Sequence, residues 1–233
     1  LYSSAASDVY KRQVCVNTGS PVTMDWAEDP AALLQIWFGG QEMAGALADV
    51  LLGDAEPGGR LPTSFPIRIE DNPSFGNFPG ENSEIRYGEG LLMGYRSYTT
   101  RRVPVRFPFG FGLSYSSFEV GQPTPSSTTF AAGEDLELEV PVENVGDRQG
   151  SEVVQCYVAP HGSRLFRPRK ELRAFGKVQL EPGEKTVLNL KLGDRSFAYW
   201  DPADADFAEI QARGGAVSVV PAGRGHEHRE KPG

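Results

Sequence analysis

The chain has 233 residues, a length that predicts one or two domains. It is 39% hydrophobic and 23% charged, so it can bury a core, and the disordered and fibrous classes are excluded. Its 31 acidic residues outnumber 23 Lys and Arg, and the formal net charge of −8 argues against nucleic acid or an anionic membrane surface as the main partner. No apolar run approaches the roughly 20 residues of a membrane span.

The first thirteen residues differ in character from the rest of the chain. Ser3–Gln13 resembles the in-frame translation of a transposon sequencing adapter, and we expect residues 1–13 to be an artefact of this kind. The alternative is an ordinary polar tail. In the adapter interpretation the natural N-terminus is missing, so the sequence does not decide between the cytoplasm and secretion.

Residues 14–118 predict part of an α/β layer with a parallel sheet. The expected elements, in chain order, are strands over 14–16 and 31–38, a helix over 41–52 and a short strand over 60–65. The helix is indicated by apolar residues at helical spacing, with Glu42 in its first turn and Gly53 as its C-terminal cap.

The segment from Pro66 to Tyr115 is rich in glycine and aromatic residues and predicts a long irregular loop over the sheet. It carries Glu81, Glu84 and Glu89 between two glycines. Glycosidases use two carboxyl groups flanking the scissile bond, so this cluster has to be weighed as catalytic. Acidic residues in such a loop are more often surface charges or ion-pair partners, and the pattern favours that interpretation.

Residues 119–127 contain two prolines among small polar residues and predict a linker. Residues 128–233 predict an antiparallel β-sandwich, because apolar and polar residues alternate along three segments, 136–142, 154–158 and 188–192.

Motifs of metal, phosphate and nucleophile chemistry are missing from the sequence. It has no P-loop, HExxH, GxSxG or CxxC pattern. His226 and His228 form a His-Glu-His run, but near a polar chain end we do not expect a metal site. The basic run from Arg164 to Arg173 could bind an anion, although a solvated strand edge fits it better. Cys15 and Cys156 are the only cysteines, which excludes a disulfide framework, and both are expected to be buried free thiols.

An ordered series of motifs resembles the C-terminal part of glycoside hydrolase family 3. It covers the chain from Val14 to about Asp201. The motifs are Asn17–Val22, Gly40–Glu42, Ala46–Leu51, Gly59–Pro62, Arg86–Gly90, Gly94–Arg96, Phe107–Gly110, Gly112–Tyr115, Glu152–Gln155, Lys170–Leu172, Pro182–Glu184 and Ala198–Asp201. The resemblance implies the end of the family's α/β sandwich domain (14–118) followed by a fibronectin type III-like domain (128–233), which stops before its usual last strand.

The resemblance also implies where the chemistry lies. Members of this family are retaining β-glycosidases, with an aspartate nucleophile on a TIM barrel and a glutamate acid/base on the α/β sandwich. The order of the motifs places both upstream of residue 14, so no catalytic residue is assigned here and no substrate-binding residue is identified. Asp25 precedes a tryptophan but follows a second-domain motif, and it is not the nucleophile. No metal or other cofactor is implied.

The sequence thus predicts the C-terminal, non-catalytic portion of an exo-acting β-glucosidase or β-xylosidase, inactive on its own. The substrate, a β-linked oligosaccharide or glycoside, would be bound through upstream domains. The alternative is a stand-alone carbohydrate-binding or adhesion module. We expect the sandwich to be a scaffold rather than a sugar platform, because only Phe166 looks exposed, while Phe175, Tyr199 and Trp200 look packed inward.

Overall fold

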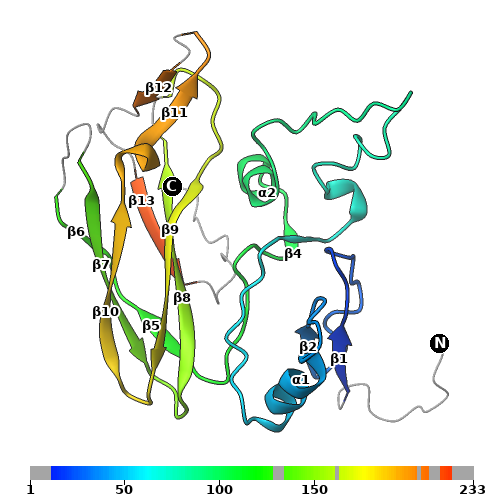
Figure 1. Cartoon of the computed structure of the whole chain (residues 1–233), viewed down its shortest axis with the longest axis vertical. Coiled ribbons are helices and arrows are strands. Elements are labelled where there is room, and N and C mark those ends of the chain that lie inside the picture. Colours follow the sequence, from blue (N-terminus) through cyan, green and yellow to red (C-terminus); the bar gives the residue numbers. More distant parts are fainter. Residues whose placement is uncertain (1–11, 128–133, 161–162, 204–205, 210–215, 222–233) are drawn as a thin grey trace, which may run out of the picture.

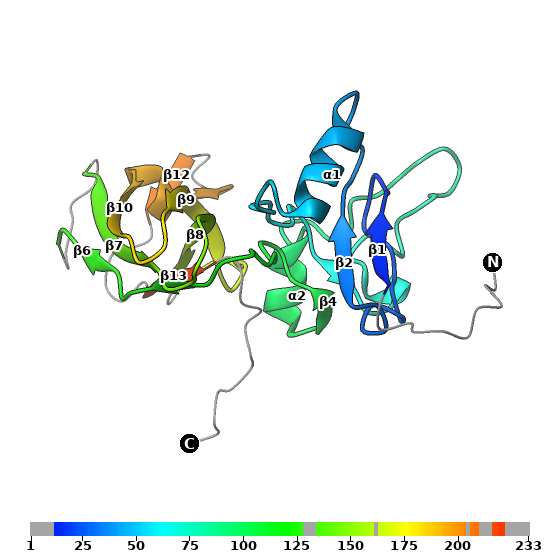
Figure 2. The ribbon, with the colours of Figure 1, turned by 90° about the horizontal axis from the view of Figure 1, so that it is seen from below.

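The computed structural model describes residues 12–127, 134–160, 163–203, 206–209 and 216–221. These residues form two bodies that lie side by side, a mixed α/β region and a β-sandwich (Figures 1 and 2). Within the described part of the chain, no helix is long and apolar enough to cross a membrane.

The α/β region is built from short elements joined by long loops. They are β1 (Gln13–Val16), β2 (Ala32–Gln35), α1 (Met43–Leu52), β3 (Phe65–Pro66), α2 (Tyr95–Arg101) and β4 (Val105–Phe107), with a 3₁₀ turn at Ile69–Asp71. β1 and β2 pair in parallel, as predicted, and β3 pairs with β4 in antiparallel orientation. Val16, Met24 and Phe65 are the buried centre of this region. This core is small, and α1 has no buried residue.

The helix predicted over 41–52 is confirmed, with one correction at its start. The helix begins at Met43, so Glu42 is the N-cap residue and its side chain makes no capping hydrogen bond; the first turn holds no acidic residue. At the other end Gly53 has φ +83°, a left-handed conformation that glycine adopts without steric cost, and its N–H donates to the helix.

Two predicted strands are shorter than expected. β2 ends at Gln35 rather than continuing to residue 38, and two residues further on Trp37 has φ +50°, outside the extended region. The prediction of a strand over 60–65 was wrong except for its last residue. Leu61 instead exchanges hydrogen bonds with the backbone of Gly110 and Phe111, and this contact fixes residues 60–64 as a loop.

The long aromatic segment contains a helix that the sequence did not predict. α2 follows Gly94 and ends at Arg102, whose φ of +57° stops the helix. Ser97 and Tyr98 are its buried residues. The rest of the segment is largely irregular, in agreement with the expectation.

The sandwich consists of two packed antiparallel sheets (Figure 1). One has the order β10-β7-β5, with β6 also paired to β7, and the other has the order β13-β8-β9. The strands are β5 (Phe118–Val120), β6 (Thr124–Pro125), β7 (Leu136–Asn144), β8 (Gly150–Ala159), β9 (Glu171–Leu180), β10 (Lys185–Leu192), β11 (Ala198–Asp201), β12 (Asp206–Glu209) and β13 (Ala216–Pro221). β11 and β12 form a separate two-stranded ribbon.

The core of the sandwich follows the predicted alternation. Along β7 the apolar side chains from Leu136 to Val142 are buried while the glutamates between them are exposed. The buried cluster comprises Phe118, Leu136, Leu138, Val140, Val142, Val154, Cys156, Val158, Leu180, Leu190, Leu192 and Phe197. Burial of one face of each sheet therefore fixes the register of its strands.

Asn144 closes one end of this core. It is fully buried, and its Nδ2 donates to the carbonyl oxygens of Arg148 (2.8 Å) and Leu180 (3.0 Å). Its Oδ1 accepts from Ser116 Oγ (2.6 Å) and from the N–H of Gly146 (3.0 Å). A single side chain thus satisfies polar groups from three segments.

The segment 119–127, predicted as a linker, differs from that expectation. Phe118–Val120 pairs with the end of β7, and Thr124–Pro125 pairs with Glu139 and Leu138. Because both stretches bond to β7, most of this segment belongs to the sandwich sheet. Pro125 is compatible with its place because β6 is bonded only to β7, and Pro123 lies between β5 and β6, outside both strands.

Candidate functional site

The three carboxylates weighed as catalytic lie in an exposed loop, and the structure does not gather them into a site. Glu81 and Glu84 exchange backbone hydrogen bonds of 3.1 and 2.9 Å across Asn82 and Ser83, which both have positive φ. This is the geometry of a tight hairpin turn. Glu89 lies apart from the turn and accepts a 2.6 Å hydrogen bond from Asn77 Nδ2. That these carboxylates are structural rather than catalytic stays a prediction.

The histidines and cysteines are the other residues weighed as candidates. His161, His226 and His228 lie outside the described residues. Among the residues that are described, no group of three or more His, Cys, Asp or Glu could hold a metal. Both cysteines are free, but only Cys156 is buried; the expectation for Cys15 was wrong, because β1 leaves its side chain exposed. Burial raises the pKa of the Cys156 thiol to about 11.

The basic run from Arg164 to Arg173 is not a solvated strand edge. Glu171, at the start of β9, is 7% exposed and pairs with three arginines. Arg96 of α2 lies 3.3 Å from it and Arg173 lies 3.1 Å from it. Arg167, 7% exposed, is its third partner and also lies over the ring of Tyr199 at 5.0 Å. One carboxylate therefore joins arginines from both bodies.

The ionised form of Glu171 is the stable one. Burial disfavours the charge, but the hydrogen bond from Arg167 and the positive charges of Arg173, Arg167 and Arg96 outweigh it and lower the pKa below its ordinary value. At neutral pH the cluster therefore keeps a surplus of positive charge.

A groove of about 590 Å³ opens beside this cluster. It is lined by Leu91, Leu165, Phe166, Arg167, Pro168, Glu171, Arg173, Arg195, Ala198, Tyr199, Trp200 and Pro202. Phe166 is exposed, as predicted. The expectation that Trp200 and Phe175 pack inward was wrong: they are 52% and 70% exposed, because β11 lies in its own ribbon and Phe175 is on the outer face of β9.

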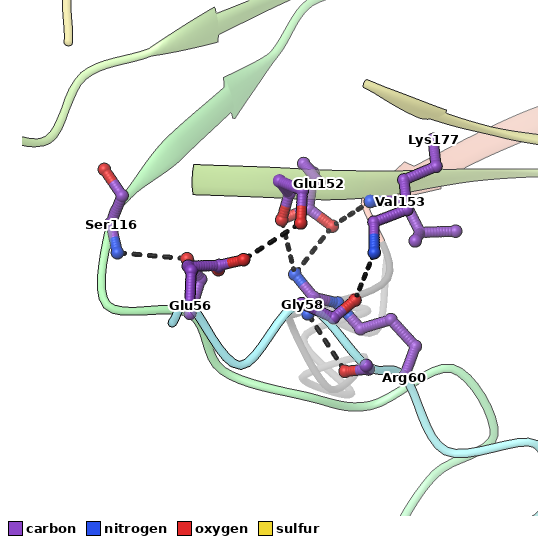
Figure 3. Close-up of polar contacts among 10 residues, drawn as sticks. Glu56, Gly58, Arg60, Ser116, Glu152, Val153 and Lys177 are labelled. Carbon is purple, nitrogen blue, oxygen red and sulfur yellow. Dashed lines mark hydrogen bonds and ion pairs between the residues drawn. The ribbon is translucent and has the colours of Figure 1, made fainter. Parts of the chain in front are cut away.

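The two bodies are joined by a buried polar junction (Figure 3). Arg60 of the α/β region lies 3.2 Å from Glu152 of β8, and their side chains are 6% and 7% exposed. Next to this pair, Ser151 Oγ donates to Glu56 at 2.9 Å, and Lys177 Nζ donates to the carbonyl oxygen of Gly58 at 3.0 Å. All these contacts cross between the bodies.

An aromatic junction lies between α2 and the sandwich. The ring of Tyr95 stacks on Phe109 at 4.8 Å and meets Tyr157 edge-on at 5.8 Å. The hydroxyl of Tyr95 accepts a 2.7 Å hydrogen bond from the N–H of Leu172. Lys170 Nζ lies 4.5 Å from the centre of the Tyr157 ring, and burial together with the charge of Arg169 lowers its pKa to about 8.

Sequence reasoning missed Glu171, Arg60 and Glu152. The signal for Glu171 was a single carboxylate in a run of five basic residues, at distances of two and four positions from arginines. Nothing local marked the Arg60–Glu152 pair, whose members are 92 positions apart.

Comparison with known proteins agrees with this architecture. The model of the glycosyl hydrolase family 3 C-terminal domain matches residues 3–115, and that of the fibronectin type III-like domain matches residues 152–217. The chain therefore contains the C-terminal domain of glycosyl hydrolase family 3, followed by a fibronectin type III-like domain. The match begins inside the segment 1–13, whose origin as an adapter remains a prediction.

The chain is similar to β-glucosidases in sequence and in structure. It is 44% identical to a β-glucosidase of Rhizobium radiobacter over 88% of this chain and 26% of that protein. It superimposes on the β-glucosidase of Bifidobacterium adolescentis with a TM-score of 0.80 at 36% identity, over 90% of this chain and 32% of that one. A Thermotoga neapolitana β-glucosidase 3B, solved with α-D-glucose, gives a TM-score of 0.77 at 32% identity, over 91% and 31%. The chain therefore spans about a quarter of the length of the curated relatives it matches.

Proposed function

We propose that this chain is the C-terminal, non-catalytic portion of a retaining, exo-acting β-glycosidase of the β-glucosidase type. The observation that carries the proposal is the 44% identity to a β-glucosidase across both bodies of the chain. The substrate would be a β-linked oligosaccharide or glycoside whose non-reducing terminal sugar is released.

The reaction would be a double displacement through a covalent glycosyl-enzyme. Its nucleophilic aspartate and acid/base glutamate are expected upstream of residue 14, in agreement with the exposed, structural setting of Glu81, Glu84 and Glu89. This chain would hold the sandwich against the α/β region, and the Arg60–Glu152 pair and the Tyr95 contacts supply the means.

A chimera tests this proposal. Residues 14–233 would replace the matching segment of the Rhizobium radiobacter β-glucosidase, and hydrolysis of an aryl β-glucoside would be followed. We expect the chimera to be active, and the isolated chain to give no turnover because it lacks both carboxyl groups.

Two results would contradict the proposal. One is a folded but inactive chimera. The other is turnover by the isolated chain that survives purification and is abolished by Glu89→Gln while the neighbouring Glu81→Gln retains it, since that would place a catalytic carboxylate in this loop.

A second candidate is a stand-alone carbohydrate-binding module, favoured by the exposed rings of Phe166 and Trp200 beside one groove. Sequencing the upstream reading frame separates the two candidates. A frame that encodes a barrel supports the glycosidase, and an open frame without one supports the binding module.

A further inference from the structure

The groove beside β11 combines an excess of arginines over carboxylates with two exposed aromatic rings. It lies where the α/β region meets the sandwich, because Leu91 lines it from one side while its remaining lining residues come from the sandwich. Its volume of about 590 Å³ lies within the range of about 300–1,000 Å³ typical of small-ligand sites. Junctions between domains are common places for such sites.

The first feature is a local excess of positive charge. Three arginines line the groove, Arg167, Arg173 and Arg195, against one carboxylate, Glu171. The chain as a whole carries a net charge of −8, so this surface has the opposite sign from the molecule. Arg167 Nη1 and Arg173 Nε are buried and have no hydrogen-bond partner among the described residues. Both guanidinium groups therefore hold an N–H donor that no described residue accepts, at an atom that is buried beneath the groove surface.

The second feature is a pair of exposed aromatic rings on the same groove. Phe166 is 65% exposed and Trp200 is 52% exposed. The two rings come from different segments of the sandwich: Phe166 precedes β9, and Trp200 lies on β11. An exposed indole offers an apolar surface that suits the apolar face of a sugar ring.

We propose that this groove binds a carboxylate-bearing sugar, a uronic acid unit of a glycan. The sugar ring stacks on Trp200 and Phe166, and its carboxylate faces the arginines. The choice of a sugar rests on the proposed function of the whole protein, whereas the choice of an acidic one rests on the charge of the groove. A neutral sugar has no negative charge to pair with the arginines, and an acidic peptide presents no flat apolar face for the two rings to stack on.

The test is a titration of the full chain with a matched pair of ligands. Methyl β-D-glucuronide and methyl β-D-glucoside differ only in the carboxylate that replaces a CH₂OH group. Binding is followed through the indole N–H resonance of Trp200, assigned by its disappearance in Trp200→Phe, since the chain has three tryptophans. We expect saturable binding of the glucuronide and about tenfold weaker binding of the glucoside, because charge-assisted hydrogen bonds are the stronger ones.

The variants separate the two features. Arg195→Gln should weaken binding of the glucuronide and leave binding of the glucoside unchanged. Trp200→Ala should weaken both, as measured by calorimetry, with circular dichroism confirming the fold. Phe175→Ala removes an equally exposed ring outside the groove and should change neither. Added salt should weaken only the glucuronide, because the ions screen the charges.

Three outcomes would overturn the proposal. They are no saturable binding of either sugar, equal affinity for both sugars, and an equal response to acetate or to an acidic tripeptide, which would indicate a simple anion site or a protein partner. None of these measurements involves hydrolysis. An inactive chimera together with glucuronide binding would reject the glycosidase proposal alone, and an active chimera without binding would reject the groove alone.

Discussion

The sandwich and the α/β region bury their apolar side chains to very different extents. Among the described residues, the buried cluster of the sandwich has twelve members, whereas that of the α/β region has three. Helix α1 is rich in Ala, Leu and Val, yet none of its residues is buried, and Leu52 is 77% exposed. The two regions have comparable lengths, so the difference lies in packing.

This difference in apolar burial indicates which of the two regions can be stable by itself. Parallel strands are normally covered on both faces, and here two parallel strands, β1 and β2, stand as a sheet of their own. The chain spans only about a quarter of its curated relatives. We therefore expect the sandwich to carry most of the stability and the α/β region to be held through its junction with it.

The largest effect should come from the core of the sandwich. Leu138 is 1% exposed, and Leu138→Ala should lower the free energy of unfolding by about 4 kcal/mol through lost burial and the cavity left behind. The matched substitution in the other region, Leu52→Ala, should change it by less than about 0.5 kcal/mol. Urea unfolding measures both. Similar costs at the two sites would contradict the comparison.

The junction should come next. Glu152→Gln removes one partner of a buried ion pair and leaves the Arg60 guanidinium uncompensated, which should cost about 3 kcal/mol. The control is Glu143→Gln, because Glu143 pairs with Lys185 at the surface at 2.9 Å, where such a pair contributes about 0.5 kcal/mol. In calorimetry Glu152→Gln should melt the α/β region before the sandwich. A single shifted transition would show that the two regions unfold as one.

The smallest effect should be a pH dependence at the aromatic junction. Burial lowers the pKa of Lys170 to about 8, from 10.5 in the unfolded chain, so between these pH values the unfolded state binds the extra proton. Stability from this group therefore rises with pH, by at most about 1.4 kcal/mol per pH unit. Lys170→Met should stabilise the chain by about 1 kcal/mol at pH 7, and less at pH 9.5.

Lys191 is the control for this experiment, because its pKa is shifted in the opposite direction from that of Lys170. Its hydrogen bond and ion pair with Asp135 raise its pKa, so its contribution is present at neutral pH and is lost as the pH rises through that value. The effect of Lys191→Met should thus also fall with pH, but from a destabilisation. An advantage of Lys170→Met that is constant from pH 7 to 9.5 would contradict the assignment.

The sequence predicted best the elements in which apolar and polar residues alternate because one face is buried. The alternation along β7 exists because one face of that strand is buried. The strands β1 and β2 were predicted from short apolar runs, and the parallel sheet was predicted from the strand–helix–strand alternation. Helix α2 gave no such signal, because Tyr95–Arg101 is short and polar and is ordered by contacts with the sandwich. The prolines at 123 and 125 were misread as a linker. Pro125 lies in β6, which is bonded on one side only and so tolerates a proline, and Pro123 lies just before that strand.

The features of the candidate site were harder to predict from the sequence, because they too depend on contacts between distant segments. That Glu171 gathers Arg96, Arg167 and Arg173 depends on the docking of α2 against β9, which no local pattern encodes. The exposure of Trp200 depends on β11 leaving the two main sheets for its own ribbon. The family resemblance supplied the organisation of the chain, and the sequence pattern indicated the basic run and the exposure of Phe166. The gathering of arginines around Glu171 and the exposure of Trp200 emerged only from the packing.

The two cysteines should differ strongly in their rate of reaction with a thiol reagent. Cys15 is exposed on β1, while Cys156 is buried in the sandwich with a pKa of about 11, so at neutral pH almost none of its sulfur is in the nucleophilic thiolate form. A thiol reagent should consume the first sulfur at once and the second only when the sandwich opens. At reagent concentrations that trap the open form faster than it recloses, the time between the two events measures the lifetime of the closed sandwich, with no label added to the chain.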